Sequence, residues 1–594
     1  MDQNLPRPEY PRPQFVRPDW LCLNGDWQFE IDPGDSGLER GLLERDLKDC
    51  ITVPFCPEAP LSGVHNTDFL NAVWYRRQVS LPEAWAGRRV LLHFQAVDYD
   101  ATVWVNGREV GRHRGGFTPF TCDLHGVAGA GETITVVVRA RDFHRELKPR
   151  GKQSPDYANA GVLYTRTTGI WQTVWLEPVP DTYLRRPRLT PDIANGLIRL
   201  EQRLNGPRAG LRLRATLRDG QGEVCTAECS VENDFSPRLD LAIPASRRRF
   251  WSLHDPHLYD VDIELLGQDG GVIDRAGSYV GLRGVSIDGL AIKINGEAIF
   301  QRLVLDQGFY PDGILTAPSE AALLADIELS RAAGFNGARL HQKVFEERFL
   351  YHADRLGYLV WGEFPDWDSR LGQTEREPGP AYITQWLEAV ERDYSHPSII
   401  GWCPLNETEQ PFTDRWQTLD DVTRGMFLAA KAMDGTRPVL DASGYSHRVA
   451  ETDVYDSHDY DQSPVDFTQR HSHTAEGKPF INRYHREQRP ISVDYHGQPY
   501  FVSEFGGMLW NPEAQAAEGA WGYGEQPRTL EEFYQRFGAL CRALLDNPGM
   551  FGYCYTQLTD VYQEQNGLYT FDRRAKFDLQ RLRDIQRRQA AIER

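Results

Sequence analysis

The sequence of 594 residues contains no run of 18 consecutive apolar residues, which is the length that a membrane-spanning helix needs. Its first residues, MDQNLPRPEYPRPQF, have no basic segment followed by an apolar stretch, as a secretory signal would. Its nine cysteines include no C-x-x-C pair, so a disulfide framework and a zinc site are both disfavoured. We therefore expect a cytoplasmic protein with reduced cysteines, no bound metal, no other cofactor and no membrane contact.

Positive charge is also scarce in this chain. There are 66 Lys and Arg residues against 85 Asp and Glu residues, which gives a formal net charge of −19 at pH 7. Nucleic acids are polyanions and bind to basic surfaces, so we do not expect a nucleic-acid partner. Aromatic residues, in contrast, are plentiful, with 15 Trp and 25 Tyr. They commonly line small-molecule sites.

The length predicts several domains, because a single core rarely extends over so many residues. Residues 1–182 show short runs of alternating apolar and polar residues separated by turns, with no segment of helical length and pattern. Asn106-Gly107, between two such runs, predicts a hairpin with a type I′ turn. We expect a β-sandwich of jelly-roll type in this region.

The remaining residues divide into two further patterns. Residues 183–284 hold about seven short predicted strands, which is typical of an immunoglobulin-like β-sandwich. In residues 285–594, short apolar runs alternate with amphipathic segments of helical length, which predicts a (β/α)8 barrel. The eight predicted barrel strands are AIFQRLVL, GARL, YLVWGEF, SIIGWCPLNE, PVLDAS, VYDSH, PYFVSEF and GMFGYCYTQL.

Two glutamates stand at the ends of predicted barrel strands. Glu407 follows the apolar run 399–405, and Glu504 follows the run 500–502. Active sites of such barrels lie at the C-terminal ends of the strands. A single glutamate there is most often a solvated loop charge, but glycoside hydrolysis requires a pair of carboxyl groups that flank one bond. The pair therefore predicts a glycosidase with Glu407 and Glu504 as its catalytic residues.

Motifs along nearly the whole chain extend this interpretation. They are Leu23-Asn24-Gly25-Asp26-Trp27, Trp74-Tyr75-Arg76-Arg77, Gly169-Ile170-Trp171, Gly334-Phe335-Asn336 with Arg339 and His341, His396-Pro397-Ser398-Ile399, and Asn406-Glu407. On these motifs the chain resembles glycoside hydrolase family 2, which holds β-galactosidases, β-glucuronidases and β-mannosidases. Each motif is weak alone, but the combination is specific.

The resemblance implies a role for each catalytic residue. Glu504 falls on the family's nucleophile and Glu407 on its acid/base, which needs a raised pKa in the substrate complex. Asn406 falls where the family hydrogen-bonds the 2-hydroxyl of the sugar. Because the family is retaining, the two carboxyl groups are expected roughly 5 Å apart.

Several other residues at the predicted barrel mouth are candidate sugar ligands. The resemblance implies that Tyr460 touches the nucleophile and that a loop of the first domain, with Arg166, leans over the mouth. His341 could instead be a histidine of the core. Arg166 could instead form a salt bridge that fixes the interface between the domains. The long segment 459–498 is expected to wall a blind pocket for one terminal sugar. The candidate sugar ligands are His341, Asp306, His458, Tyr460, Trp510, Glu363 and Arg166.

The sugar itself is less constrained. The loop 565–568 reads Gln-Asn-Gly-Leu and lacks the Lys of the Asn-x-Lys pair with which β-glucuronidases hold a carboxylate, so we expect a β-galactosidase-like specificity. An arabinosidase, a glucuronidase and a transglycosylating enzyme remain alternatives. A carbohydrate-binding protein without turnover is the alternative of another class. The sequence leaves open whether the chain forms a homo-oligomer.

Overall fold

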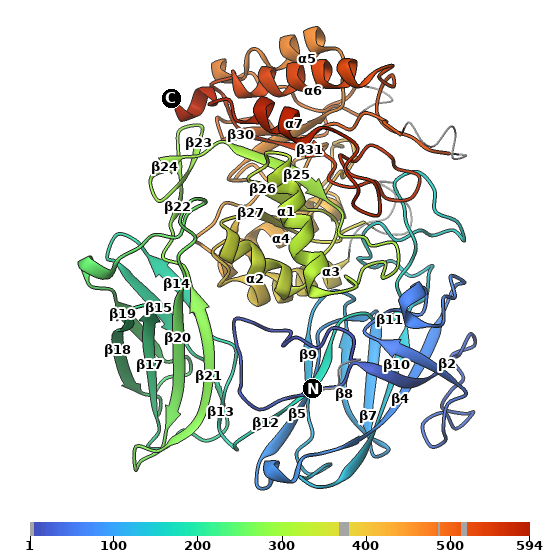
Figure 1. Cartoon of the computed structure of the whole chain (residues 1–594), viewed down its shortest axis with the longest axis vertical. Helices are drawn as coiled ribbons and strands as arrows, with labels where there is room; N and C mark the ends of the chain where they lie inside the picture. Colours follow the sequence, from blue (N-terminus) through green and yellow to red (C-terminus); the bar gives the residue numbers. More distant parts are fainter. Residues whose placement is uncertain (1–4, 368–378, 485–487, 512–518) are drawn as a thin grey trace.

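The computed structural model of the protein describes residues 5–367, 379–484, 488–511 and 519–594, which form three units. Two β-sandwiches lie side by side, and an α/β unit sits above both of them (Figure 1). The start of the chain runs between the two sandwiches. This arrangement confirms the predicted combination of a jelly roll, an immunoglobulin-like sandwich and a barrel.

The first unit packs a six-stranded antiparallel sheet, in the order β3-β2-β4-β10-β7-β8, against a four-stranded one, in the order β1-β12-β5-β9. Alternation along β10 buries Ile134, Val136 and Val138 between the sheets. The predicted hairpin joins β7 to β8, with φ of 51° at Asn106 and 77° at Gly107. The strands are β1 (Leu21–Cys22), β2 (Gly25–Ile31), β3 (Asp49–Val53), β4 (Ala72–Ser80), β5 (Arg89–Phe94), β6 (Val97–Asp98), β7 (Asp100–Val105), β8 (Arg108–Arg114), β9 (Phe120–Asp123), β10 (Thr133–Arg141), β11 (Gly169–Ile170) and β12 (Val174–Val179).

The second unit packs the sheet β14-β15-β19 against the sheet β18-β17-β20-β21. Along β17, Leu213 and Leu217 point into the core, whereas Arg214 and Arg218 face solvent and pair with acids of β20. This alternation follows from the two-residue period of a strand. The strands are β13 (Tyr183–Leu184), β14 (Arg188–Asp192), β15 (Leu197–Glu201), β16 (Leu204–Asn205), β17 (Arg212–Asp219), β18 (Gly222–Ser230), β19 (Arg238–Ala242), β20 (Tyr259–Leu266) and β21 (Val272–Val280).

The third unit is built on seven parallel strands in the order β28-β27-β26-β25-β31-β30-β29, and its helices cover the outside. A small sheet of β22 (Val285–Asp288), β23 (Ala291–Ile294) and β24 (Glu297–Ala298) precedes it. The parallel strands are β25 (Gln301–Asp306), β26 (Gly337–Leu340), β27 (Leu359–Glu363), β28 (Ile399–Cys403), β29 (Tyr455–Asp459), β30 (Tyr500–Gly506) and β31 (Met550–Thr556).

The fifth predicted strand, residues 438–443, differs from the expectation. It is joined to Trp402 of β28 by an isolated bridge at Val439, and to Asn406 in the loop after β28 by an isolated bridge at Ser443. Side-chain bonds replace the ladder on its other side, because Asp441 accepts from the backbone N–H groups of Arg448 and Val449, and Ser443 donates to Asp456. The segment therefore fills the fifth position of the barrel without forming a regular strand.

The helices begin and end at residues with clear local signals. Ser319 caps α1 by accepting from the backbone of Ala322, and Pro380 begins α3. Gly357 ends α2 with a φ of 66°, the left-handed conformation that glycine adopts at low cost. None of the helices in the described part of the chain is long and apolar enough to cross a membrane. The helices are α1 (Glu320–Ala332), α2 (Glu347–Leu356), α3 (Pro380–Asp393), α4 (Thr418–Met433), α5 (Pro464–His471), α6 (Leu530–Leu545) and α7 (Leu579–Gln586).

Glu347, the first residue of α2, is buried where the three units meet. It accepts a hydrogen bond of 2.6 Å from Gln95 of the first unit and bonds of 2.7 and 2.8 Å from Arg186 of the second. Burial acts to raise the pKa of Glu347, but the charge and hydrogen bonds of Arg186 outweigh it and lower this pKa to about 2. One carboxylate thus ties both sandwiches to the barrel.

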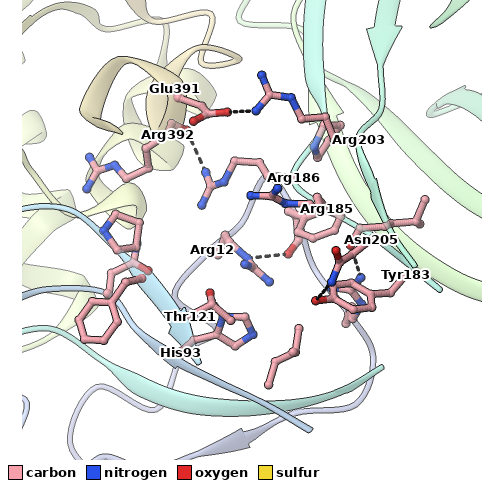
Figure 2. Close-up of a pocket in the computed structure, with 18 of the residues that line it drawn as sticks. Arg12, His93, Thr121, Tyr183, Arg185, Arg186, Arg203, Asn205, Glu391 and Arg392 are labelled. Atoms are coloured by element: carbon pink, nitrogen blue, oxygen red, sulfur yellow. Dashed lines mark hydrogen bonds and ion pairs between the residues drawn. The ribbon is translucent and has the colours of Figure 1, made fainter. Parts of the chain in front are cut away.

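A cavity of about 400 Å³ opens beside this junction and is lined by all three units (Figure 2). It is rich in arginine, and three of its arginines form ion pairs between or within the units. Arg12 binds Glu177 of the first unit, Arg186 binds Glu347, and Arg203 binds Glu391 of α3 at 2.8 Å. The cavity therefore lies at an interface between the units that is rich in ion pairs. Its lining includes neither Glu407 nor Glu504.

Replacing Glu347 with Gln should leave Arg186 without its counter-charge and lower the apparent free energy of unfolding by about 3 kcal/mol. The folded pKa of Glu347 lies below its ordinary value of 4.5, so its contribution is complete above that pH and is lost as pH falls towards 2. Denaturant titrations of both proteins between pH 7 and pH 2 should show the difference shrinking over this interval.

Glu391→Gln is the matched control, since it removes a half-exposed ion pair with Arg203 across the same junction. We expect a change below about 1 kcal/mol for this variant. Equal effects of the two substitutions would show that Glu347 does not hold the units together.

Candidate active site

The two predicted carboxylates converge at the C-terminal end of the barrel strands. Glu504 lies within β30, and Glu407 lies four residues beyond the end of β28. One oxygen of each carboxylate and one ring nitrogen of His458 lie within 4.8 Å of one another. No ion is needed to account for this group, because each member has hydrogen-bond partners in the protein.

Arg339 of β26 holds the nucleophile candidate from inside the barrel. Its guanidinium donates to Glu504 at 3.1 Å and to the carbonyl oxygen of Ser503 at 2.6 Å. The same group donates to Glu363 at 2.5 Å and to the side-chain oxygen of Asn406 at 3.1 Å. A rigid, planar fork of donors thereby fixes residues that come from three different strands or strand ends.

Glu363 and His341 form a layer behind this arginine. Glu363, at the end of β27, accepts from Arg339 and lies 3.1 Å from the Nδ1 atom of His341. Burial and the charge of Lys152 lower the pKa of His341 well below its usual range. His341 is therefore neutral at neutral pH, and its Nδ1 atom lies nearer to the carboxylate of Glu363, at 3.1 Å, than to that of Glu504, at 4.0 Å.

Glu407 is held by its backbone and by one histidine. Its φ of 52° is left-handed, which is uncommon for a residue other than glycine, and its N–H donates to the carbonyl oxygen of Ser443 at 2.8 Å. The Nδ1 atom of His458 lies 2.8 Å from Glu407. Burial acts to raise the pKa of Glu407, but the hydrogen bond and charge of His458 outweigh it, so this pKa is lowered.

His458 carries the complementary shift. Burial acts to lower the pKa of His458, but the charges of Glu504 and Glu407 raise it above its ordinary value. Its other nitrogen, Nε2, lies 3.0 Å from the hydroxyl of Ser443. The imidazole is therefore positioned to be charged between two carboxylates.

Tyr460 is the second group on Glu504. Its hydroxyl donates to that carboxylate at 2.5 Å, and its ring stacks on Tyr523. The segment that follows β29 returns to support these residues, because Asn482 bonds both the N–H and the carbonyl oxygen of His458. Part of the predicted wall 459–498 thus fixes the end of β29; residues 485–487 lie outside the described residues.

Asn406 presents a free donor. Its side-chain oxygen accepts from Arg339, whereas its buried side-chain nitrogen has no hydrogen-bond partner among the described residues. Its backbone oxygen accepts from the indole of Trp367 at 3.0 Å. The amide is oriented by these contacts, and its N–H₂ group remains available to a ligand.

A loop of the first unit reaches the barrel mouth, as the resemblance implies, and it does so through Tyr164 and Lys152 rather than through Arg166. The loop rises from the first sandwich beside the barrel in Figure 1. The hydroxyl of Tyr164 donates to Glu564, in the loop after β31, and its ring packs on Phe309 with the centroids 4.9 Å apart. Lys152 lies over the ring of Trp367 with its nitrogen 5.3 Å from the centroid.

Arg166 has a different role from the predicted one. Its guanidinium is buried and donates to carbonyl oxygens of Ser154, Asp156 and Thr67, all within the first unit, and it stacks on Phe69. Three carbonyl groups of the loop and its neighbourhood are satisfied by these donors. Arg166 therefore shapes the loop, and the expected contact with sugar hydroxyls is corrected.

Two other candidates are also placed differently from the expectation. Burial, with the nearby charge of Asp326, raises the pKa of Asp306 to about 7, and its carboxylate accepts from the N–H of Gly308 at 2.9 Å. Trp510 is half-buried and packs its ring against Phe577.

Few signals in the sequence point to the residues that support the catalytic pair. Arg339 is a charge inside the short apolar strand GARL, and a buried charge in a strand is a signal that it has partners. Lys152 and Tyr164 lie in irregular backbone of another domain, where no periodicity marks them. Only the tertiary contact shows that they belong to the site.

Comparison with known proteins places these observations in a family. The sugar binding domain of glycosyl hydrolases family 2 matches residues 60–154, a second domain of the same family matches residues 182–283, and its TIM barrel domain matches residues 316–588. The matches follow the order of the three structural units.

Individual relatives are more distant. A β-glucuronidase of Paenibacillus borealis is 26% identical over 421 residues, which cover 65% of this chain and 67% of that protein. A β-galactosidase of Thermoanaerobacter pseudethanolicus is 26% identical over 401 residues, which cover 65% of this chain and 51% of that protein. The crystal structure of the Ruminococcus gnavus β-glucuronidase has 19% identity and a TM-score of 0.78, over 98% of this chain and 99% of that chain, and shows the shared fold.

All three matched domains belong to one family, occur in one order and together span most of the chain. The chain therefore belongs to glycosyl hydrolase family 2 and is a glycoside hydrolase.

Proposed function

We propose that the protein is a retaining, exo-acting β-glycosidase in which Glu504 is the nucleophile and Glu407 is the acid/base. The observation that carries this proposal is the approach of the two carboxylates, whose facing oxygens lie within 4.8 Å at the C-terminal end of the barrel. Inverting enzymes keep their carboxyl groups about 6.5–9.5 Å apart to admit a water between them. The closer spacing suits direct attack by one carboxylate.

In the first step a Glu504 oxygen forms a bond to the anomeric carbon while the bond from that carbon to the leaving oxygen breaks. Arg339 and Tyr460 orient the attacking carboxylate by hydrogen bonds to its two oxygens. A proton passes from Glu407 to the leaving oxygen, so the aglycone departs as a neutral alcohol. In the second step Glu407 takes a proton from water, the resulting hydroxide oxygen bonds the anomeric carbon, and Glu504 is released.

The lowered pKa of Glu407 in the free protein calls for a proton source, and His458 supplies one. The imidazole lies 2.8 Å from Glu407 and 3.5 Å from Glu504, so the pair of Glu407 and His458 holds one proton in the field of the nucleophile. As Glu504 bonds to carbon its negative charge is consumed, and the imidazolium loses part of its stabilisation. The proton then shifts through Glu407 to the leaving oxygen.

The terminal sugar can be narrowed to a class but not to a single sugar. The expected β-galactosidase-like preference is not favoured by the relatives, which include β-glucuronidases as well as β-galactosidases. We propose a terminal β-linked hexose or hexuronic acid as the substrate. Exo action is supported by the loop with Lys152 and Tyr164, which contacts the loop after β31 across one side of the mouth.

Glu504→Gly should abolish hydrolysis of a p-nitrophenyl β-glycoside by removing the nucleophile, with a loss of about 10⁴-fold or more. Sodium azide should restore turnover, because the small anion occupies the vacated space and attacks the anomeric carbon. The product is then an α-glycosyl azide, identified by NMR. Full activity of this variant without azide would remove Glu504 from the mechanism.

Glu407→Ala should slow alkyl β-glycosides by roughly 10²–10⁴-fold but affect a 2,4-dinitrophenyl glycoside less, because its leaving group departs without a proton. The ratio of kcat/KM between the two substrates is the measurement. Glu409→Ala, two residues along the same loop, is the matched control and should leave the ratio unchanged. The reverse pattern would transfer the acid/base role to Glu409.

His458→Gln should move the alkaline limb of the kcat/KM profile to lower pH. In the native pair the proton is held by an imidazole whose pKa is raised, whereas in the variant the carboxyl group of Glu407 must hold it alone. His352→Gln on α2, which removes a histidine bonded to Glu320, is the control. An alkaline limb that stays in place or moves up would show that His458 does not share the catalytic proton.

A further inference from the structure

Lys152 is a lysine of the first unit that lies inside the mouth of the barrel. Its side chain is only 4% exposed, and its ammonium group donates no hydrogen bond to any described residue. The nearest carboxylate is that of Glu564 at 3.9 Å, beyond hydrogen-bond distance. Aromatic rings of Trp367 and Tyr164 flank the ammonium, with centroids 5.3 and 5.4 Å away.

Backbone contacts on both sides of Lys152 fix its position. Gly151 has a φ of 64°, its N–H donates to the carbonyl oxygen of Pro365, and a Cβ atom there would lie 2.2 Å from the carbonyl oxygen of Gln342. Only glycine permits this close approach to the loops after β26 and β27. The carbonyl oxygen of Lys152 in turn accepts from the N–H of Tyr164 at 2.8 Å.

The ammonium group stands next to the catalytic residues. Trp367, which lies beneath it, donates to the backbone of Asn406 and packs edge-on against His341. The positive charge of Lys152 contributes to lowering the pKa of Glu407 and that of His341. Lys152 therefore lies close to Glu407 and His341 at the barrel mouth.

Withdrawing an ammonium group from water is costly unless acceptors replace its hydration. Three donors of Lys152 find no acceptor among the described residues, whereas the donors of Arg339 are engaged by Glu363, Glu504, Asn406 and Ser503. Among the described residues, Lys152 thus has only the long ion pair with Glu564 and no hydrogen-bonded acceptor. A carboxylate on the substrate would satisfy it through a charge-assisted hydrogen bond and would otherwise be repelled by Glu407 and Glu504.

We propose that Lys152 determines the substrate class by binding the carboxylate of a terminal β-linked uronic acid. The inference rests on the proposed function, because it assumes that the sugar occupies the space between Lys152 and Glu504. A lysine of the first unit then completes a site whose catalytic groups all come from the barrel. The neutral hexoses are bound without this contact and are the poorer substrates.

Two substrate pairs that differ only at C6 test the proposal: p-nitrophenyl β-glucuronide against β-glucoside, and β-galacturonide against β-galactoside. The wild-type protein should have the higher kcat/KM for the uronide in at least one pair. Lys152→Met, which keeps the length of the side chain, should reduce kcat/KM for that uronide about 100-fold and for its neutral partner less than about 5-fold. Retained hydrolysis of the neutral sugar shows that the variant is folded.

Lys148→Met is the matched control, because Lys148 is a buried lysine in the same loop that binds Asp142 of its own unit. This variant should leave the ratio between uronide and neutral sugar unchanged. Equal losses on both sugars in Lys152→Met, or a wild-type preference for the neutral sugar in both pairs, overturns the proposal.

A protein that is not a β-glycosidase would give a different result from a β-glycosidase in which Lys152 has another role. If the wild-type protein hydrolyses none of the four glycosides, calorimetric titration with free glucuronate, galacturonate, glucose and galactose reads the role of Lys152 from binding alone. Loss of uronate binding in Lys152→Met, with neutral sugars unaffected, supports the proposal. Uronate binding that is absent from the wild-type protein or unchanged in the variant contradicts it.

Discussion

The catalytic end of the barrel depends on the buried guanidinium of Arg339. Its donors reach Glu363 on the neighbouring strand β27, Glu504 and the carbonyl oxygen of Ser503 on the more distant strand β30, and Asn406 next to Glu407. The guanidinium is also the only fixed positive charge that hydrogen-bonds Glu504 within the described residues. Because a buried arginine is stable only when such partners surround it, the geometry of the site and the burial of Arg339 require each other.

The second constraint is the fit of the first unit onto the barrel. Gly151 allows backbone to approach backbone, Tyr164 bonds Glu564, and Glu347 joins Gln95 and Arg186 at the far side of the junction. These contacts are polar and buried, so they are sensitive to relative displacement of the units. They place Lys152 beside groups that belong to the barrel, and the active site is therefore a product of two domains.

The architecture was predictable from local patterns. Period-2 alternation, the Asn106-Gly107 turn and the switch to helix-length segments after residue 285 depend on neighbouring residues, and the structure confirms the three classes of unit that they indicate. The irregular fifth position was not predictable. There, hydrogen bonds of the Asp441 and Ser443 side chains replace the backbone hydrogen bonds that a regular strand would make. The distinction between a strand and an extended segment there depends on partners distant in the sequence.

The sequence by itself determined that Asn406, Glu407 and Glu504 meet, because each follows an apolar run and parallel strands end at a common rim. The family resemblance added His458 and Tyr460 to this group. Only the tertiary structure decided what surrounds them. It directed Arg166 into its own loop and Trp510 against Phe577, and it brought Lys152 to the barrel mouth. The physical reason is that periodicity fixes which face of a strand a residue occupies, whereas the contacts of an irregular loop are fixed by packing and hydrogen bonds to another domain.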